Sequence, residues 1–168
     1  MSEDRLRKLE QRLEDVEAKL ELYQMFSAFG PSIDSGGDDN VVDFFSEDAE
    51  YRSNVATLEP VRGHKAIKAI FTGDMHQGAI KGGIGHVLSF PHIVIDGNKA
   101  IVINHSTIFL KGEAGWQIVR VASNRFECER RDGRWFITAR DNMALGDPEA
   151  RALFGDVPYD VPWLTKNG

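Results

Sequence analysis

Two strand-like runs joined by Asp132-Gly133 dominate the second half of the sequence. The segment 116–141 reads WQIVRVASNRFECERRDGRWFITARD, with β-branched and aromatic residues on both sides of the Asp-Gly pair. An Asp-Gly pair between such runs is the strongest short-range signal for a β-hairpin, because both residues tolerate positive φ. An isolated two-stranded ribbon is marginal in water, so the rest of the chain must supply further strands and a layer that covers one face.

Further strands are predicted on the N-terminal side of this hairpin. The alternation of apolar residues predicts long strands at about 86–95, 99–111, 115–129 and 134–142, joined by short turns that contain glycine. Connections this short join antiparallel neighbours. A short additional strand is predicted at 49–53.

The N-terminal region predicts an amphipathic helix. Apolar residues recur at alternating spacings of three and four, at Leu6, Leu9, Leu13, Val16, Leu20 and Tyr23. The stripe covers too few heptads to establish a coiled coil. We therefore expect the part from Val16 to Phe29 to lie on its own domain, and a role of the outer turns in dimerisation stays open. Gly30-Pro31 is expected to kink or end this helix.

Two shorter helices and one irregular segment are predicted next. The helices are expected at 39–45 and 65–71. The glycine-rich segment 73–83 has no period and is expected to be a lid or a long connection. Helices followed by a strand meander predict an α+β fold, in which a curved antiparallel sheet wraps around the N-terminal helices. The expected divisions are a helical extension (1–15), the α+β domain (16–146) and a tail packed on the domain or on a partner subunit (147–168).

The composition excludes several classes of protein. Hydrophobic residues make up 42% of the 168 residues and charged residues 27%, as in an ordinary globular domain. The formal net charge of -6 argues against a nucleic-acid partner. Cys128 is the only cysteine, which excludes an intrachain disulfide and is typical of a reducing compartment. A charged N-terminus and the lack of a run of about 18 apolar residues predict neither a signal peptide nor a membrane span, so a cytoplasmic location is expected.

No sharp catalytic motif is present, so the candidates are single polar residues on elements predicted to be apolar inside. His86 begins the first long strand, where an imidazole can act as a general base. Asp34 lies where the first helix is expected to break. Each residue also has an ordinary structural explanation, as a hydrogen-bonded core histidine or as a turn aspartate. If the two meet, the carboxylate fixes the imidazole tautomer and raises its basicity, which predicts a catalytic dyad.

Other polar residues interrupt the apolar strands. Tyr51 is either a core aromatic residue or a donor to a substrate oxygen, and Arg140 is either a surface residue or a site for negative charge. Asn124 and Asn104 need hydrogen-bond partners wherever they are buried. Alternation does not decide whether Asn104 or His105 points inward, because both faces of that strand are apolar.

The remaining histidines carry weaker signals. His64 precedes a predicted helix and His76 lies in the glycine-rich segment, so both are expected to be solvated. His92 follows a proline, and its face is uncertain. Three histidines on strands permit a metal site, but their spacing matches no ligand pattern, and no metal is predicted.

Several short patterns occur in the order found in a known family. They are FGPSID at 29–34, VVDFF at 41–45, RGHKAI at 62–67, His86 before IDGNKA at 95–100, and RDGRWFITAR at 131–140. From Leu13 to Leu145 the sequence resembles the SnoaL-like family of the nuclear transport factor 2 superfamily. The resemblance implies a cone-shaped α+β barrel. It constrains function less, because this fold hosts dehydratases, isomerases, cyclases and non-catalytic subunits.

Within that family, the scytalone dehydratases and the hexachlorocyclohexane dehydrochlorinases are the useful analogies. Both place an Asp-His dyad inside the cone, which corresponds here to Asp34 and His86. The similarity to the dehydratases implies that Tyr51, in the pattern EYRS, and Asn124 bind substrate. Arg140 matches a pocket arginine of the dehydrochlorinases.

The sequence also departs from both groups. Ile33 replaces a second tyrosine of the dehydratases, and Phe29 stands where the dehydrochlorinases have a lysine. The second histidine of the dehydratases has no secure counterpart. His105 is the nearest candidate and is therefore expected among the substrate-binding residues.

The expected function is that of a lyase or isomerase without a cofactor, acting on a small hydrophobic cyclic or aromatic compound. His86 would remove a proton from carbon while Asp34 orients it. Two alternatives stay open. One is a non-catalytic subunit similar to the small subunits of ring-hydroxylating dioxygenases, and the other is a small-ligand-binding protein. A homodimer or homotrimer is expected, with neither nucleic acid nor a membrane as partner.

The hairpin register decides whether two of these residues serve one site. A two-residue Asp-Gly turn places Arg125 opposite Arg140, so that Asn124 and Arg140 lie on different faces. A one-residue bulge near the turn would bring them onto the same face. The hypothesis of a shared site therefore requires such a bulge.

Overall fold

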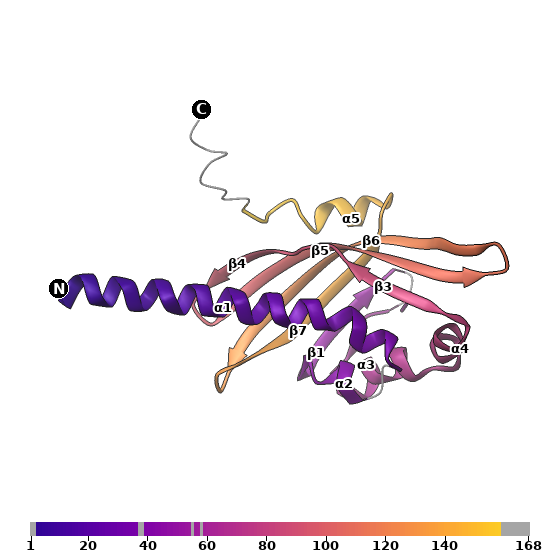
Figure 1. Ribbon diagram of the computed structural model, residues 1–168, viewed down its shortest axis with the longest axis horizontal. Helices are drawn as coiled ribbons and strands as arrows, with labels where there is room; N and C mark the ends of the chain where they lie inside the picture. The colour runs from indigo at the N-terminus through magenta and orange to yellow at the C-terminus, as the bar shows by residue number, and fades with distance from the viewer. Residues whose placement is uncertain (1–2, 37–38, 55, 58, 159–168) are drawn as a thin grey trace, which may run out of the picture.

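A computed structural model describes residues 3–36, 39–54, 56–57 and 59–158. Its helices are α1 (Glu3–Asp34), α2 (Asp39–Val42), α3 (Gly63–Thr72), α4 (Asp74–Gly82) and α5 (Pro148–Ala152) (Figure 1). Its strands are β1 (Phe45–Ser53), β2 (Val61–Arg62), β3 (Ile84–Leu88), β4 (His92–Asp96), β5 (Lys99–Gly112), β6 (Gly115–Arg131) and β7 (Arg134–Ala144). Among the described helices, none is both long enough and apolar enough to cross a membrane.

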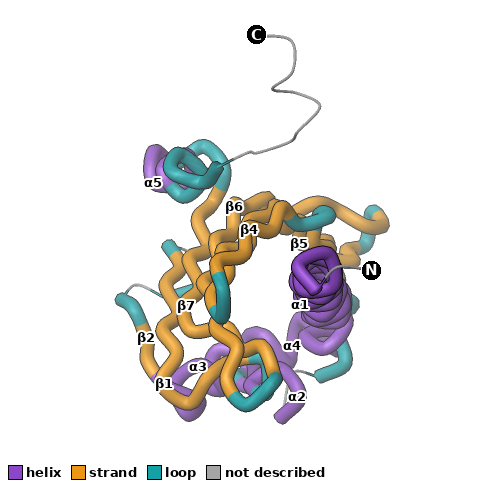
Figure 2. Tube along the Cα trace, turned by 90° about the vertical axis from the view of Figure 1, so that its left-hand side faces the viewer, coloured by secondary structure: helices purple, strands orange, loops and turns teal. Residues whose placement is uncertain are grey.

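The strands form one curved sheet in the order β2-β1-β7-β6-β5-β3, with β4 also paired to β5. The sheet bends into an arc that does not close; its open side is occupied by α1, α3 and α4, and α5 lies outside the arc (Figure 2). The α+β prediction is confirmed. The sheet is mixed rather than wholly antiparallel, because β1 runs parallel to β7. These two strands are far apart in the sequence, so no short turn forces them to be antiparallel.

Helix α1 supplies the layer that covers the concave face of the sheet. Its buried residues are Ala18, Leu22, Phe26, Phe29, Gly30 and Ile33. The helix runs through Pro31 to Asp34, contrary to the predicted break. Proline removes only one backbone donor here, and the amide of Ser35 donates to the carbonyl of Pro31 at 3.0 Å, which continues the helical pattern beyond it.

Gly30 allows this helix to approach β3 closely. A Cβ atom at Gly30 would lie 2.4 Å from the carbonyl oxygen of His86, a distance that no side chain tolerates. Glycine is therefore required where the helix meets the strand. The contact brings the end of α1, and with it Asp34, against the start of β3.

Several boundaries differ from the sequence prediction. The second helix ends at Val42 rather than at residue 45, and β1 begins at Phe45 rather than at residue 49. The segment 73–83 forms α4 rather than an irregular connection, because Gly78 and Gly82 hid its apolar spacing without preventing a helix. The predicted strand 86–95 is divided into β3 and β4 around Pro91. Proline cannot donate to a strand ladder, which explains the interruption.

The β6–β7 hairpin contains a one-residue bulge, so its register differs from the one that the Asp-Gly turn alone predicts. Cys128 pairs with Ile137, but Glu127 pairs with Ala139, so Thr138 is the extra residue. As a result Arg140 lies opposite Phe126 rather than Arg125. Asn124 and Arg140 share one face of the sheet, as the hypothesis of a shared site requires.

The described part of the tail packs on the outer face of the sheet. Ala150 and Leu153 form a small apolar cluster with Met143 of β7. Arg125 ties the tail to β6 by donating to the carbonyl of Leu153 at 3.2 Å and to Asp156 at 2.7 Å. Residues 159–168 of the predicted tail lie outside the described residues.

Candidate active site

A cavity of about 530 Å³, here called the inner cavity, lies between the concave face of the sheet and helices α1, α3 and α4. Its apolar wall includes Ile33, Ile70, Phe71, Leu88 and Ile108. The polar side chains that reach it include Tyr51, His76, His86, Arg120 and Arg140. An apolar pocket with a few convergent polar groups is the usual form of a small-molecule site.

Asp34 and His86 are in direct contact at this cavity. Oδ1 of Asp34 lies 2.6 Å from Nδ1 of His86, and the backbone amide of His86 donates to Oδ2 of Asp34 at 2.9 Å. The carboxylate therefore holds both the ring and the backbone of the histidine. An Nδ1–H that donates to the carboxylate leaves Nε2 as the nitrogen that can accept a proton.

The surroundings of His86 favour its neutral form. Burial lowers the pKa of His86 below its ordinary value, while the hydrogen bond and the charge of Asp34 raise it in part. The positive charges of Arg140 and Arg120 lower it further. A neutral imidazole with one free nitrogen is the form that a general base requires.

Arg140 reaches the cavity from β7 and is only 6% exposed. Its guanidinium carbon lies 5.0 to 5.2 Å from the ring centroids of Phe29, Tyr51 and Phe126. It donates to Oδ1 of Asn124 at 2.9 Å. Burial lowers the pKa of Arg140, and the three ring faces offset part of the cost of burying the cation.

Asn124 does not line the cavity, contrary to its predicted contact with substrate. It is 0% exposed, and its Oδ1 accepts hydrogen bonds from Arg140 and from Asn142, at 2.9 and 2.7 Å. Asn124 therefore positions Arg140. Tyr51 does reach the cavity, and its ring lies in the core between Phe45 and Phe71.

His105 lies on the opposite face of the sheet. Its neighbours Asn104 and Ser106 are buried on the concave side, and alternation along β5 therefore turns His105 outward. Its ring contacts that of Phe154 in the tail, with centroids 5.3 Å apart. The structure thus separates His105 from the inner cavity, and the expected pocket position is wrong.

His76 also lies at the inner cavity, although the sequence predicts it to be solvated. Helix α4 carries it over the cavity, where its ring lies 5.6 Å from that of His86 and 5.9 Å from that of Phe71. Nε2 of His76 is buried without a hydrogen-bond partner among the described residues. Burial and the neighbouring His86 lower the pKa of His76.

His64 is also predicted to be solvated, but its Nε2 lies 2.9 Å from the carbonyl oxygen of Phe45.

Arg120 is a cavity residue that was not predicted from the sequence. It lies on β6 and pairs with Ile108 of β5. The next pair is Phe109 with Ile118, so Val119 is an extra residue that forms a bulge on β6. Its guanidinium bonds Oδ1 of Asn142 and lies 3.4 Å from Oγ of Ser53. The available signal was that Arg120 precedes Asn124 by an even number of residues, so alternation placed a charge on the face that carries the predicted site.

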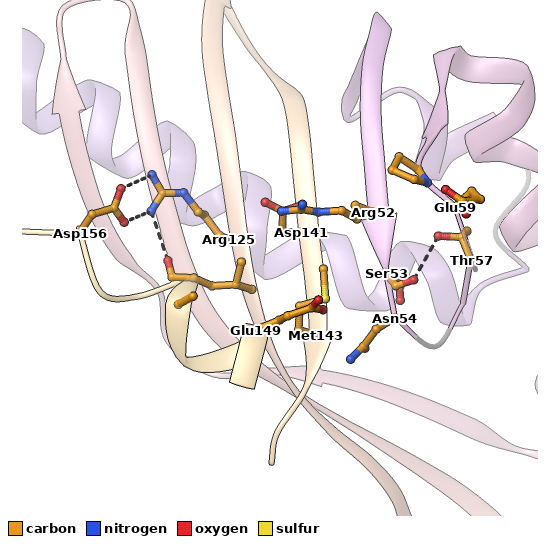
Figure 3. A pocket seen from close by; sticks show the side chains of 13 residues that line it. Arg52, Ser53, Asn54, Thr57, Glu59, Arg125, Asp141, Met143, Glu149 and Asp156 are labelled. Atoms are coloured by element: carbon orange, nitrogen blue, oxygen red, sulfur yellow. Dashed lines mark hydrogen bonds and ion pairs between the residues drawn. The ribbon is translucent and has the colours of Figure 1, made fainter. Parts of the chain in front are cut away.

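A second hollow, of about 550 Å³, lies on the outer face between β1, β7 and the tail (Figure 3). Each of its two arginines lies beside a carboxylate. Arg52 lies 2.6 Å from Asp141, and Arg125 lies 2.7 Å from Asp156. In contrast to the inner cavity, this hollow presents no acid–base dyad among the described residues, and no group of three potential metal ligands was found in the described chain.

The fold and the inner cavity define a class of protein: an α+β domain in which a curved, unclosed sheet and its covering helices line an apolar pocket. The model of the SnoaL-like domain matches residues 14–141, and the chain belongs to this family. The family resemblance read from the sequence is therefore confirmed. Members of the family include dehydratases and isomerases. No curated protein sequence matches the chain significantly.

Solved structures show the same fold. An NTF2-like protein with a cystatin-like fold from Novosphingobium aromaticivorans is 29% identical, with a TM-score of 0.84 over 90% of this chain and 98% of that chain. A candidate scytalone dehydratase from the same organism is 18% identical, with a TM-score of 0.63 over 77% and 85% of the two chains. A candidate aromatic ring hydroxylase, also from that organism, is 23% identical, with a TM-score of 0.61 over 79% and 92%.

Proposed function

We propose that the chain is a lyase or isomerase that needs no cofactor and acts on a small hydrophobic cyclic or aromatic compound. The observation that carries this proposal is the contact of 2.6 Å between Asp34 and His86 at the wall of the inner cavity. A carboxylate that fixes an imidazole beside an apolar cavity is an arrangement suited to general-base catalysis. Family membership is consistent with this reaction class.

In the proposed reaction, Nε2 of His86 takes a proton from a carbon atom of the substrate. The electron pair left on carbon then moves toward an adjacent carbonyl oxygen, or forms a double bond as a leaving group departs from the next carbon. Arg140 and Tyr51 lie where they can stabilise negative charge on oxygen. His86 carries the proton after this step and would return it to the product or to the leaving group, while His76, the second imidazole at the cavity, would hydrogen-bond that group.

The proposal can be tested without knowing the substrate. 5-Nitrobenzisoxazole is an apolar aromatic compound whose ring opens to a coloured phenolate when a base removes its carbon-bound proton. We expect the wild-type protein to accelerate this opening and His86→Gln to lose about 100-fold or more of the rate, as expected for a positioned general base. Initial rates are followed by absorbance.

The control is His92→Gln, which removes an imidazole from β4, outside the inner cavity. It should keep the wild-type rate. Near-UV circular dichroism checks that both variants retain the fold. Equal rates for wild type and His86→Gln would remove His86 from the mechanism. Saturable binding of the compound with no acceleration would favour the alternative of a small-ligand-binding protein.

A further inference from the structure

The inner cavity contains two guanidinium groups that no described carboxylate neutralises. Arg140 has Asn124 and three aromatic rings around it, and Arg120 has Asn142 and Ser53. Nε of each arginine is buried without a hydrogen-bond partner among the described residues. Buried donors and charges cost free energy unless a partner satisfies them, so these two groups are poised for a ligand.

The other charges at the cavity do not balance them. The carboxylate of Asp34 is hydrogen-bonded to His86, and Asp74 is exposed at the first turn of α4. His76 and His86 both have lowered pKa values, which favours their neutral forms. The cavity interior therefore carries more positive than negative charge, although the whole chain carries a formal charge of -6.

Two arginines on the outer face of the sheet differ from those of the inner cavity in having carboxylate partners. Arg52 and Arg125 each lie beside a carboxylate, and Figure 3 shows Arg125 directed at Asp156. These two arginines are thus neutralised by carboxylates, whereas Arg120 and Arg140 of the inner cavity have no carboxylate partner among the described residues. Planar guanidinium groups bind carboxylates through two parallel hydrogen bonds, which makes a carboxylate the matching ligand group.

We propose that the inner cavity selects a cyclic or aromatic monocarboxylate, whose carboxylate binds Arg120 and Arg140 while its ring lies against the apolar wall toward His86. This inference rests on the proposed function and adds a substrate class to it. Arg120 becomes the residue that determines specificity. Its position on β6 faces Ile108, so it lies where the apolar wall meets the polar end of the cavity.

The test compares two ligands that differ only in charge, 2-naphthoate and 2-naphthamide, by isothermal titration calorimetry. We expect the full chain to bind the carboxylate about tenfold or more tightly than the amide, as one charge-assisted interaction provides. Arg120→Gln should weaken 2-naphthoate binding about tenfold and leave 2-naphthamide binding nearly unchanged. Arg120→Lys should keep part of the preference because it keeps the charge.

Arg125→Gln is the matched control, since it removes a guanidinium from the outer face of the same strand. It should leave both affinities at the wild-type values. Equal affinities for the two ligands, failure to bind 2-naphthoate at millimolar concentration, or an equal effect of Arg125→Gln would overturn the inference. The measurement needs no turnover, so it is repeated in His86→Gln. If this variant still binds 2-naphthoate more tightly than 2-naphthamide, and the substitution does not slow ring opening, the proposed reaction is rejected and the carboxylate site is kept.

Discussion

Asp34 and the other surroundings of His86 shift the pKa of its ring in opposite directions. Burial and the two nearby arginines lower the pKa of His86, whereas the hydrogen bond and the charge of Asp34 raise it. The net direction is downward, so the ring stays neutral to a lower pH than a solvated histidine. The dyad thus gives an imidazole that is held in place and available as a base on both sides of pH 7.

Removing the charge of Asp34 should lower the pKa of His86 further. In Asp34→Asn the influences that raise this pKa are lost and burial remains, so the acid limb of the ring-opening rate should move to lower pH. The plateau rate should fall because the ring is less basic and less firmly oriented. Titration of the His86 ring by NMR, from about pH 4 to 8, measures the shift directly.

The matched control for this variant is Asp15→Asn, which removes an exposed carboxylate from the same helix, far from the cavity. It should leave the titration of His86 unchanged. A pKa in Asp34→Asn equal to or above the wild-type value would show that the carboxylate does not govern the protonation of the ring.

The site was only partly predictable at the residue scale. Asp34 and His86 stood out because each is a polar residue at the boundary of an apolar element. His76 did not, because its neighbouring glycines concealed a helix, and only the packing of α4 brings it beside His86. His105 was misplaced because both faces of β5 are apolar in the sequence, and the side covered by α1 is decided by tertiary packing.

At the scale of elements, the contact between α1 and β3 holds the dyad together. Gly30→Ala should destabilise the domain by about 1–3 kcal/mol, because the new methyl group would meet backbone rather than a movable side chain. The gain in helix propensity, about 1 kcal/mol, is too small to offset this cost. Urea denaturation measures the stability, and the NMR titration of His86 reports whether the dyad has separated.

Gly78→Ala provides the comparison. It lies inside α4, where an added Cβ meets nothing within 4 Å. This variant should gain about 0.5–1 kcal/mol of stability, since alanine loses less backbone entropy in a helix. If Gly30→Ala were as stable as the wild type, the close approach of helix and strand would not be required for the fold.

Elements were more predictable than sites for a physical reason. The strands and the turn of the β6–β7 hairpin follow from local patterning, because turn chemistry and alternation act between near neighbours, but the bulge at Thr138 does not. The parallel pairing of β1 with β7 joins residues far apart in the chain, such as Tyr51 and Arg140, and no local pattern encodes it. That pairing is what places both residues at one cavity.

At the scale of the whole molecule, α1 has two apolar faces, of which one is buried in the domain and the other is exposed. The face with Leu22, Phe26 and Phe29 is buried in the domain. The predicted stripe is not: the exposed fractions of Leu6, Leu9, Leu13, Val16 and Leu20 are 43% to 60%. Figure 1 shows the N-terminal part of α1 extending beyond β4 and the β6–β7 hairpin. An apolar stripe of this length on a projecting helix marks an interaction surface.

We propose that this stripe mediates self-association of the chain, by packing against the same stripe of a second or third copy. Its residues follow the spacing that two helices need to interlock, and water leaves both surfaces when they meet. Leu9→Glu combined with Leu13→Glu should convert a dimer or trimer into a monomer, because each glutamate would be buried without a partner. Sedimentation velocity measures the mass.

The control is Gln11→Glu, which changes an exposed residue between the two leucines and should keep the wild-type mass. A monomeric wild type, or an unchanged mass in the double variant, would show that the stripe does not hold copies together.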